Sequence, residues 1–283
     1  MLETGGFAAS AAEIVYVAAA QALTSGRLDE AEAFLMRQAE NGKRAGLSFY
    51  EENAASKLAG IQLFRGGSAI YGSEAIEGGW LHAIYRSYER LMHTGDPAPL
   101  PDPGLAGGSP WQVATVLLYR AEFRALAGDL DGAAHEIHEF DAMFAAVEPF
   151  SHAFTELGRR YMGVRWLGES ATSSQSAAVI RRHSSHKLFW ALVVPRLRGE
   201  LALAAGDLEL AESSLMDGLD WCIRERCPVE EGRVRQALAE LAEKRSDHAA
   251  AVEQLDRAGE LFQQFGAKLF LDQVLAKKEI LKA

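Results

Sequence analysis

The fold follows from the stretch Arg196-Leu-Arg-Gly-Glu-Leu-Ala-Leu-Ala-Ala-Gly-Asp-Leu-Glu-Leu-Ala-Glu-Ser-Ser-Leu215, in which two helical segments flank the pair Gly206-Asp207. Glycine can adopt the left-handed conformation that ends a helix, and aspartate can cap the helix that follows. Gly199 and Ala211 place small residues where two antiparallel helices must approach closely. The stretch therefore predicts a tight helical hairpin.

The same pattern occurs elsewhere in the chain: a small residue seven positions before the turn, glycine or serine at the turn, a small residue five positions after it and an aliphatic residue nine positions after it. The other copies are Ala19, Gly26, Ala31 and Leu35; Gly60, Gly67, Gly72 and Ile76; Ala121, Gly128, Ala133 and Ile137; and Ala239, Ser246, Ala251 and Leu255. The spacing of the turns indicates a repeating unit of roughly 40 residues.

Two wider intervals between the turns need an explanation. One contains Gly95-Asp-Pro-Ala-Pro-Leu-Pro-Asp-Pro-Gly-Leu-Ala-Gly-Gly-Ser-Pro110, whose prolines and glycines predict a loop inserted between repeats. The other leaves room for a degenerate copy near Gly168, with Tyr161 and Ser173 at positions that are small in the other copies. Pro195 lies within the segment from His186 to Ala205, so we expect a helix that begins near Pro195 or is kinked there.

Helical hairpins with small residues around a Gly-Asp turn resemble the tetratricopeptide repeat family over nearly the whole chain. The long period is similar to that of the sensor regions of the maltotriose-responsive transcription activator and related signalling ATPases. Ala258–Leu275 resembles the last hairpin of helical regions that follow ATPase and nucleotide cyclase domains. The resemblance implies one all-α domain over residues 1–283, a right-handed superhelical solenoid of about six or seven antiparallel hairpins. Because the first repeat lacks a distinct cap, we expect a fragment of a larger protein.

Composition excludes several classes of protein. The chain is 48% hydrophobic, without an apolar run long enough for a transmembrane helix and without the basic and apolar regions of a signal peptide. Cys222 and Cys227 lie on one predicted helix, where their side chains diverge. We therefore predict a reduced, cytoplasmic protein with no membrane partner. The net charge of −10 argues against direct binding of nucleic acid.

Basic residues are nevertheless concentrated between Gly158 and Gly199, where Glu169 is the single acidic residue. The basic residues of this patch are Arg159, Arg160, Arg165, Arg181, Arg182, Lys187, Arg196 and Arg198. Two interpretations remain open. The long side chains can cover a helical surface and pair with acids of adjoining repeats, or they can form a patch that binds an acidic partner or an anionic ligand.

The sequence contains few patterns typical of catalytic or metal-binding sites. The histidines of His135-Glu-Ile-His138-Glu139 are three residues apart, whereas the zinc protease motif needs four, so a solvated helix face is the better interpretation. Gly104–Ser109 is followed by no lysine and preceded by no strand, which argues against a phosphate loop. We therefore predict no enzyme activity, no metal and no cofactor.

Two functions compete. The first is a non-catalytic scaffold of a regulatory protein that binds a protein or peptide partner, including an acidic one, through the groove of the solenoid. The second is a ligand-sensing module, in which a small molecule or peptide inside the superhelix controls an attached ATPase, cyclase or transcription-regulator domain.

The resemblance also implies which side chains face the groove: those three and six residues before, and one residue after, the small position of each first helix. The expected residues are Val193, Arg196 and Glu200; Arg233, Gln236 and Glu240; and Lys57. Arg196, Arg233 and Gln236 are then expected on adjacent walls, where guanidinium groups can hold a carboxylate or phosphate. The alternative is that Arg196 and Arg233 pair with Glu200 and Glu240 on their own helices.

Overall fold

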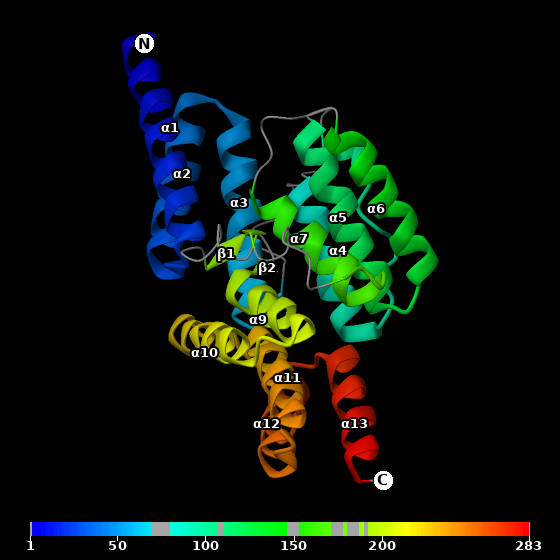
Figure 1. Ribbon diagram of the computed structural model, residues 1–283. Coiled ribbons are helices and arrows are strands. Elements are labelled where there is room, and N and C mark those ends of the chain that lie inside the picture. The colour runs from blue at the N-terminus through cyan, green and yellow to red at the C-terminus, as the bar shows by residue number, and fades with distance from the viewer. Residues whose placement is uncertain are drawn as a thin grey trace.

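The computed structural model describes residues 2–68, 80–106, 110–145, 153–170, 178–179, 187–189 and 192–282 (Figure 1). The helices are α1 Leu2–Thr24, α2 Leu28–Ala45, α3 Ser48–Phe64, α4 Trp80–Thr94, α5 Pro110–Leu126, α6 Leu130–Ala145, α7 Ala153–Trp166, α9 Val194–Ala205, α10 Leu208–Glu225, α11 Pro228–Lys244, α12 His248–Gln264 and α13 Lys268–Lys282. A short 3₁₀ helix spans Pro103–Ala106, and β1 Leu188–Phe189 pairs antiparallel with β2 Leu192–Val193. The predicted all-α class is confirmed.

The turn at Gly206-Asp207 has the predicted chemistry. Gly206 has a φ of 79°, and its amide donates to the carbonyls of Ala202 and Leu203 at the end of α9. The Asp207 carboxylate accepts from the amide of Leu210 at 3.0 Å and so caps α10. The same cap is present at the start of α12, where Asp247 accepts from Ala250 at 3.0 Å. The hydrogen bonds to Asp207 and Asp247 satisfy amides that a helix leaves unpaired at its start.

Close packing explains the small residue before the turn. A Cβ atom added at Gly199 would lie 2.5 Å from the side chain of Leu215, so the two helices of this hairpin meet at the glycine. Gly60 is equally restricted, but by the ring of Tyr85 on α4. The predicted positions Gly72 and Ile76 lie outside the described residues. α9 begins at Val194 with Pro195 in its first turn, which confirms the first of the two expectations for this proline.

The Pro/Gly-rich segment is a loop held onto the helices around it. Ser87 donates to the carbonyl of Pro99 at 2.7 Å, and Arg120 donates to the carbonyl of Pro101 at 3.2 Å. Residues 95–102 contain no helix or strand, Pro103–Ala106 form the 3₁₀ helix, residues 107–109 lie outside the described part, and α5 begins at Pro110.

Helices that are neighbours in the sequence pack against one another along the chain, as repeats do, but the early helices also contact the late ones. The indole of Trp221 on α10 donates to the carbonyl of Gly26 at 2.8 Å, and Glu225 accepts from the amide of Leu28 at 3.0 Å. We call these two hydrogen bonds the α10 clasp. α13 packs against α4, where a ring nitrogen of His93 lies 2.8 Å from the carbonyl oxygen of Gly266. The later helices therefore contact both the first hairpin and α4, while the two ends of the chain lie far apart (Figure 1).

The buried apolar side chains form one core cluster that extends from α1 to α13. Cys222 and Cys227 belong to it as free thiols, and burial raises the pKa of each. Among the described helices, none combines the length and the apolar character needed to cross a bilayer.

Candidate functional site

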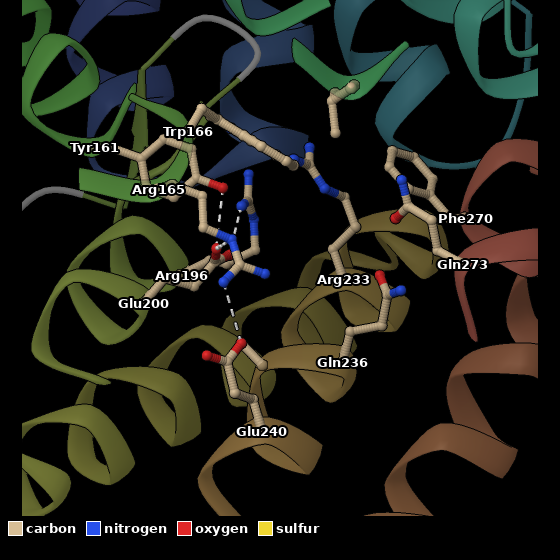
Figure 2. Close-up of a pocket in the computed structure, with 12 residues that line it drawn as sticks. Tyr161, Arg165, Trp166, Arg196, Glu200, Arg233, Gln236, Glu240, Phe270 and Gln273 are labelled. Atoms are coloured by element: carbon tan, nitrogen blue, oxygen red, sulfur yellow. Dashed lines mark hydrogen bonds and ion pairs between the residues drawn. The ribbon is translucent and has the colours of Figure 1, made fainter. Parts of the chain in front are cut away.

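A pocket opens where α5, α7, α9, α11 and α13 converge, and Figure 2 shows the side chains around it. Its volume is about 90 Å³. It is lined by Leu126, Tyr161, Arg165, Trp166, Arg196, Glu200, Arg233, Gln236, Ala237, Glu240, Phe270 and Gln273. The structure thus brings together five of the side chains expected in the groove, namely Arg196, Glu200, Arg233, Gln236 and Glu240.

Arg196 lies at the centre of this pocket and is completely buried. Its Nη1 donates to Oε1 of Glu200 at 2.7 Å, and its Nε donates to Oε2 of Glu230 at 3.2 Å. The pairing of Arg196 with Glu200 on its own helix is thus present. Nη2 of Arg196 has no hydrogen-bond partner among the described residues.

Arg233 is also buried, and its guanidinium group is held by side chains of its own helix, α11, and of α4 and α5. Nη1 donates to Glu230 at 2.9 Å and to the hydroxyl of Tyr88 at 3.0 Å, and Nη2 donates to Glu122 at 3.2 Å. The ring of Phe270 lies 5.0 Å from the guanidinium carbon, within the range of a cation–π contact. Glu240, the expected partner of Arg233, instead accepts from Arg165 at 3.3 Å.

The electrostatics of the cluster follow from these contacts. Burial acts to raise the pKa of Glu230, but Arg233 and Arg196 outweigh burial and hold that pKa below its usual value. The pKa of Glu200 is also lowered, since Arg196 and Arg165 outweigh the effect of burial. Burial raises the pKa of Tyr161, whose hydroxyl donates to Glu200 at 2.9 Å. The glutamates are therefore ionised and the tyrosine neutral at pH 7.

The lining contains a surplus of hydrogen-bond donors. Besides Nη2 of Arg196, the indole Nε1 of Trp166 is buried without a partner in the described part of the chain. The lining carboxylates are used: Glu200 accepts from Arg196 and Tyr161, and Glu240 accepts from Arg165. Buried polar groups are rarely left unpaired, so these two donors need an explanation.

Lys57 does not line the pocket. It is buried on α3, and its Nζ lies 4.5 Å from the centre of the Tyr16 ring. Burial lowers the pKa of Lys57 to about 8. The repeat register therefore selected a buried side chain in a different part of the interior, between α3 and α1.

The basic patch divides into separate contacts. Arg159 donates to Asp141 and to Glu169, each at 2.7 Å, and Arg160 donates to Glu169 at 2.8 Å. Arg165 belongs to the pocket, and burial lowers the pKa of Arg198. Arg181 and Arg182 lie outside the described residues. For Arg159, Arg160 and Arg165 the structure supports the first interpretation, in which basic side chains pair with nearby acids.

Sequence reasoning missed Tyr88, Glu122 and Glu230, which hold Arg233 from α4, α5 and α11. Glu230 precedes Arg233 by three residues on one helix, and that spacing is a signal for pairing. Tyr88 and Glu122 carry no comparable signal, because they reach Arg233 only through contacts between helices that are far apart in the sequence.

No group of three or more histidine, cysteine, aspartate or glutamate side chains is placed to hold a metal ion within the described ranges. His135 lies 3.4 Å from Glu139 on an exposed face of α6. No protein-family model and no curated protein sequence matches the chain.

Proposed function

We propose that this chain is a non-catalytic, ligand-sensing regulatory module of the tetratricopeptide type, a helical solenoid with a small pocket between its helices. The observation that carries the proposal is the pocket itself, which is lined by side chains from α5, α7, α9, α11 and α13. A ligand there would touch hairpins that are far apart in the sequence, so its binding can change how they pack.

The size and the burial of the site favour a small ligand over a folded partner. A volume of about 90 Å³ is smaller than the cavity of about 150 Å³ that takes benzene in an engineered apolar core. Arg196 and Arg233 are buried and already bound by Glu200, Glu230 and Glu122, so they offer no open guanidinium face to a long acidic segment.

Regulation would follow from the position of the pocket. α7 and α9 contribute Trp166 and Arg196 to one wall, while α11 and α13 contribute Gln236 and Phe270 to another. A molecule that fills the space between these walls binds the closed arrangement more tightly than a more open one. Its binding therefore stabilises the closed arrangement. We place this module in a reducing, cytoplasmic setting because its two cysteines are free thiols.

A thermal-shift screen of the whole chain against small metabolites tests the proposal, with a pocket-filling variant as its check. Ala237→Leu adds bulk to the pocket wall, where Ala237 is 4% exposed. Ala249→Leu makes the same change at an exposed position of α12. We expect a compound that raises the melting temperature of the natural chain and of Ala249→Leu, but not of Ala237→Leu. A library with no such compound would refute the sensor function.

A protein-interaction scaffold is the second candidate, and exposed apolar side chains near the start of the chain favour it. Ile14 and Val17 on α1 are 70% and 56% exposed, and Phe49 on α3 is 57% exposed. Ile14 and Val17 are three residues apart and so share a helix face. Pull-down with the natural chain and with Ile14→Asp/Val17→Asp tests this function, which predicts a partner that only the natural chain retains.

A further inference from the structure

We infer that the outer face of α1 binds the same face of a second copy of this chain, so that two molecules form an antiparallel helix pair with twofold symmetry. The ligand-sensing pocket plays no part in this contact. The apolar face concerned is the one that also favours a scaffold, and a second copy is the occupant that its side chains fit. The spacing of these side chains, their lack of charge and their match to one another carry the proposal.

The exposed side chains of α1 have the spacing of a helix that has a helical partner. They form a narrow stripe that consists of Ser10, Ile14, Val17 and Gln21. The steps of four, three and four residues are those of the seam between two helices of a coiled coil. Ile14 and Val17, at the centre of the stripe, are 70% and 56% exposed. The other side of α1 packs against α2, so the stripe lies open at the edge of the molecule (Figure 1).

The stripe also lacks the charges of an ordinary surface helix. Between residues 10 and 24 of α1, Glu13 is the single charged residue. Its carboxylate accepts from the hydroxyl of Tyr50, which offsets part of the cost of removing it from water. The exposed face of α12, by contrast, carries Glu253, Asp256 and Arg257. Depletion of charge is what distinguishes the core of a protein interface from the rest of a surface.

The stripe matches itself when the second copy runs in the opposite direction. In an antiparallel pair centred between Ile14 and Val17, each of these side chains lies opposite the other one in the second copy. The same register sets Ser10 opposite Gln21, whose amide can exchange a hydrogen bond with the serine hydroxyl. Because the pair is symmetric, each of these contacts occurs twice. Apolar side chains therefore meet apolar ones at the centre, and polar side chains meet at both ends.

The position of Glu13 decides between the two directions. In the antiparallel pair Glu13 is level with Ala18 of the second copy, so the two Glu13 carboxylates lie apart. A parallel pair would set the two Glu13 side chains at the same level, where like charges repel. The macrodipoles of two helices also interact favourably when the helices run in opposite directions.

Sedimentation equilibrium of the whole chain measures the association. The seam is short, although Phe49, 57% exposed and in contact with the ring of Tyr16, extends the apolar surface to α3. We therefore expect a dimer with a Kd on the order of 10 μM. Ile14→Asp/Val17→Asp should weaken dimerisation at least tenfold, because the dimer would bury the added charges.

The matched control makes the same change on a different helix. Leu275 and Ile280 on α13 are 51% and 69% exposed, so Leu275→Asp/Ile280→Asp adds the same charges at apolar surface positions away from α1. This control should dimerise as the natural chain does. Circular dichroism should show the natural helical content in both variants, since all four side chains are exposed.

Disulfide cross-linking tests the antiparallel register with substitutions that add no charge. Ser10→Cys and Gln21→Cys are prepared separately and then mixed under mild oxidation. Positions 10 and 21 are about 16 Å apart along the helix, so in the antiparallel pair two copies of the same variant hold their new thiols too far apart for a disulfide. We expect a cross-linked dimer from the mixture and from neither variant alone. The natural chain, whose Cys222 and Cys227 are buried, is the control.

Four results would overturn the proposal. They are a natural chain that stays monomeric at ten times the expected Kd, a dimer that Ile14→Asp/Val17→Asp does not weaken, a dimer that the α13 control weakens equally, and cross-linking of Ser10→Cys with itself. A monomeric chain that captures a different protein through Ile14 and Val17 would also exclude the second copy, and it would support the scaffold. The sensor function is tested separately, by the thermal-shift screen with Ala237→Leu.

Discussion

Replacing Glu230 by glutamine removes a negative charge from the middle of the buried cluster and changes its shape very little. Glu230 is 1% exposed and accepts from Arg233 at 2.9 Å, from Tyr88 at 3.0 Å and from Arg196 at 3.2 Å. Removing one partner of a buried ion pair costs about 3–5 kcal/mol, because the remaining charge is left uncompensated. Glu200 still pairs with Arg196, and Glu122 still pairs with Arg233. We therefore expect the free energy of unfolding to fall by about 3 kcal/mol, near the lower end of this range.

Equilibrium unfolding in urea, followed by circular dichroism, measures the loss, and Glu231→Gln is the matched control. Glu231 is the next residue on α11 and pairs with Arg235 at 2.8 Å, with both side chains 17% exposed. A partly exposed pair of this kind contributes less than about 1 kcal/mol. If Glu230→Gln lowered the free energy of unfolding no more than Glu231→Gln does, the cluster would not be the stabilising centre described above.

Two further predictions concern stability. The pKa values of Glu200 and Glu230 are lowered in the folded chain, so the stability that they contribute is complete above the unfolded value of about 4.3 and is lost as the pH falls towards their folded values. Melting temperatures should therefore drop below about pH 4.3, and less steeply in Glu230→Gln. Ser246, at φ 60°, occupies a turn where other copies have glycine. Ser246→Gly should raise the free energy of unfolding by about 0.5–1 kcal/mol in urea titrations, and a decrease would contradict the strain argument.

The sequence predicts the hairpins because their determinants are local. Gly206 and Asp207 fix a helix end and a helix start through hydrogen bonds within a few residues, and Gly199 fixes the distance between two adjacent helices. The weak copy near Gly168 assigns Tyr161 to a position that is small in the other copies. The ring of Tyr161 is too large for a close helix contact and instead lines the pocket.

The site is only partly predictable from the sequence. The repeat register brought Arg196 and Arg233 to one pocket, but it placed Lys57 with them, whereas Lys57 is buried against Tyr16. Tyr88 and Glu122 could not be found, because their contact with Arg233 depends on how the whole chain curves. These residues belong to α4 and α5, far from α11 in the sequence, and no single motif encodes their meeting with Arg233.

The α10 clasp gives the chain a different folding behaviour from that of an open repeat array. In an open array each repeat touches only its neighbours, so the terminal repeats fray first and unfolding proceeds inwards. Here Trp221 and Glu225 bind the turn between α1 and α2, so the first hairpin cannot detach without opening the contact with α10. Unfolding of the first hairpin is therefore coupled to unfolding of α10. The first hairpin should lose its structure together with the C-terminal helices.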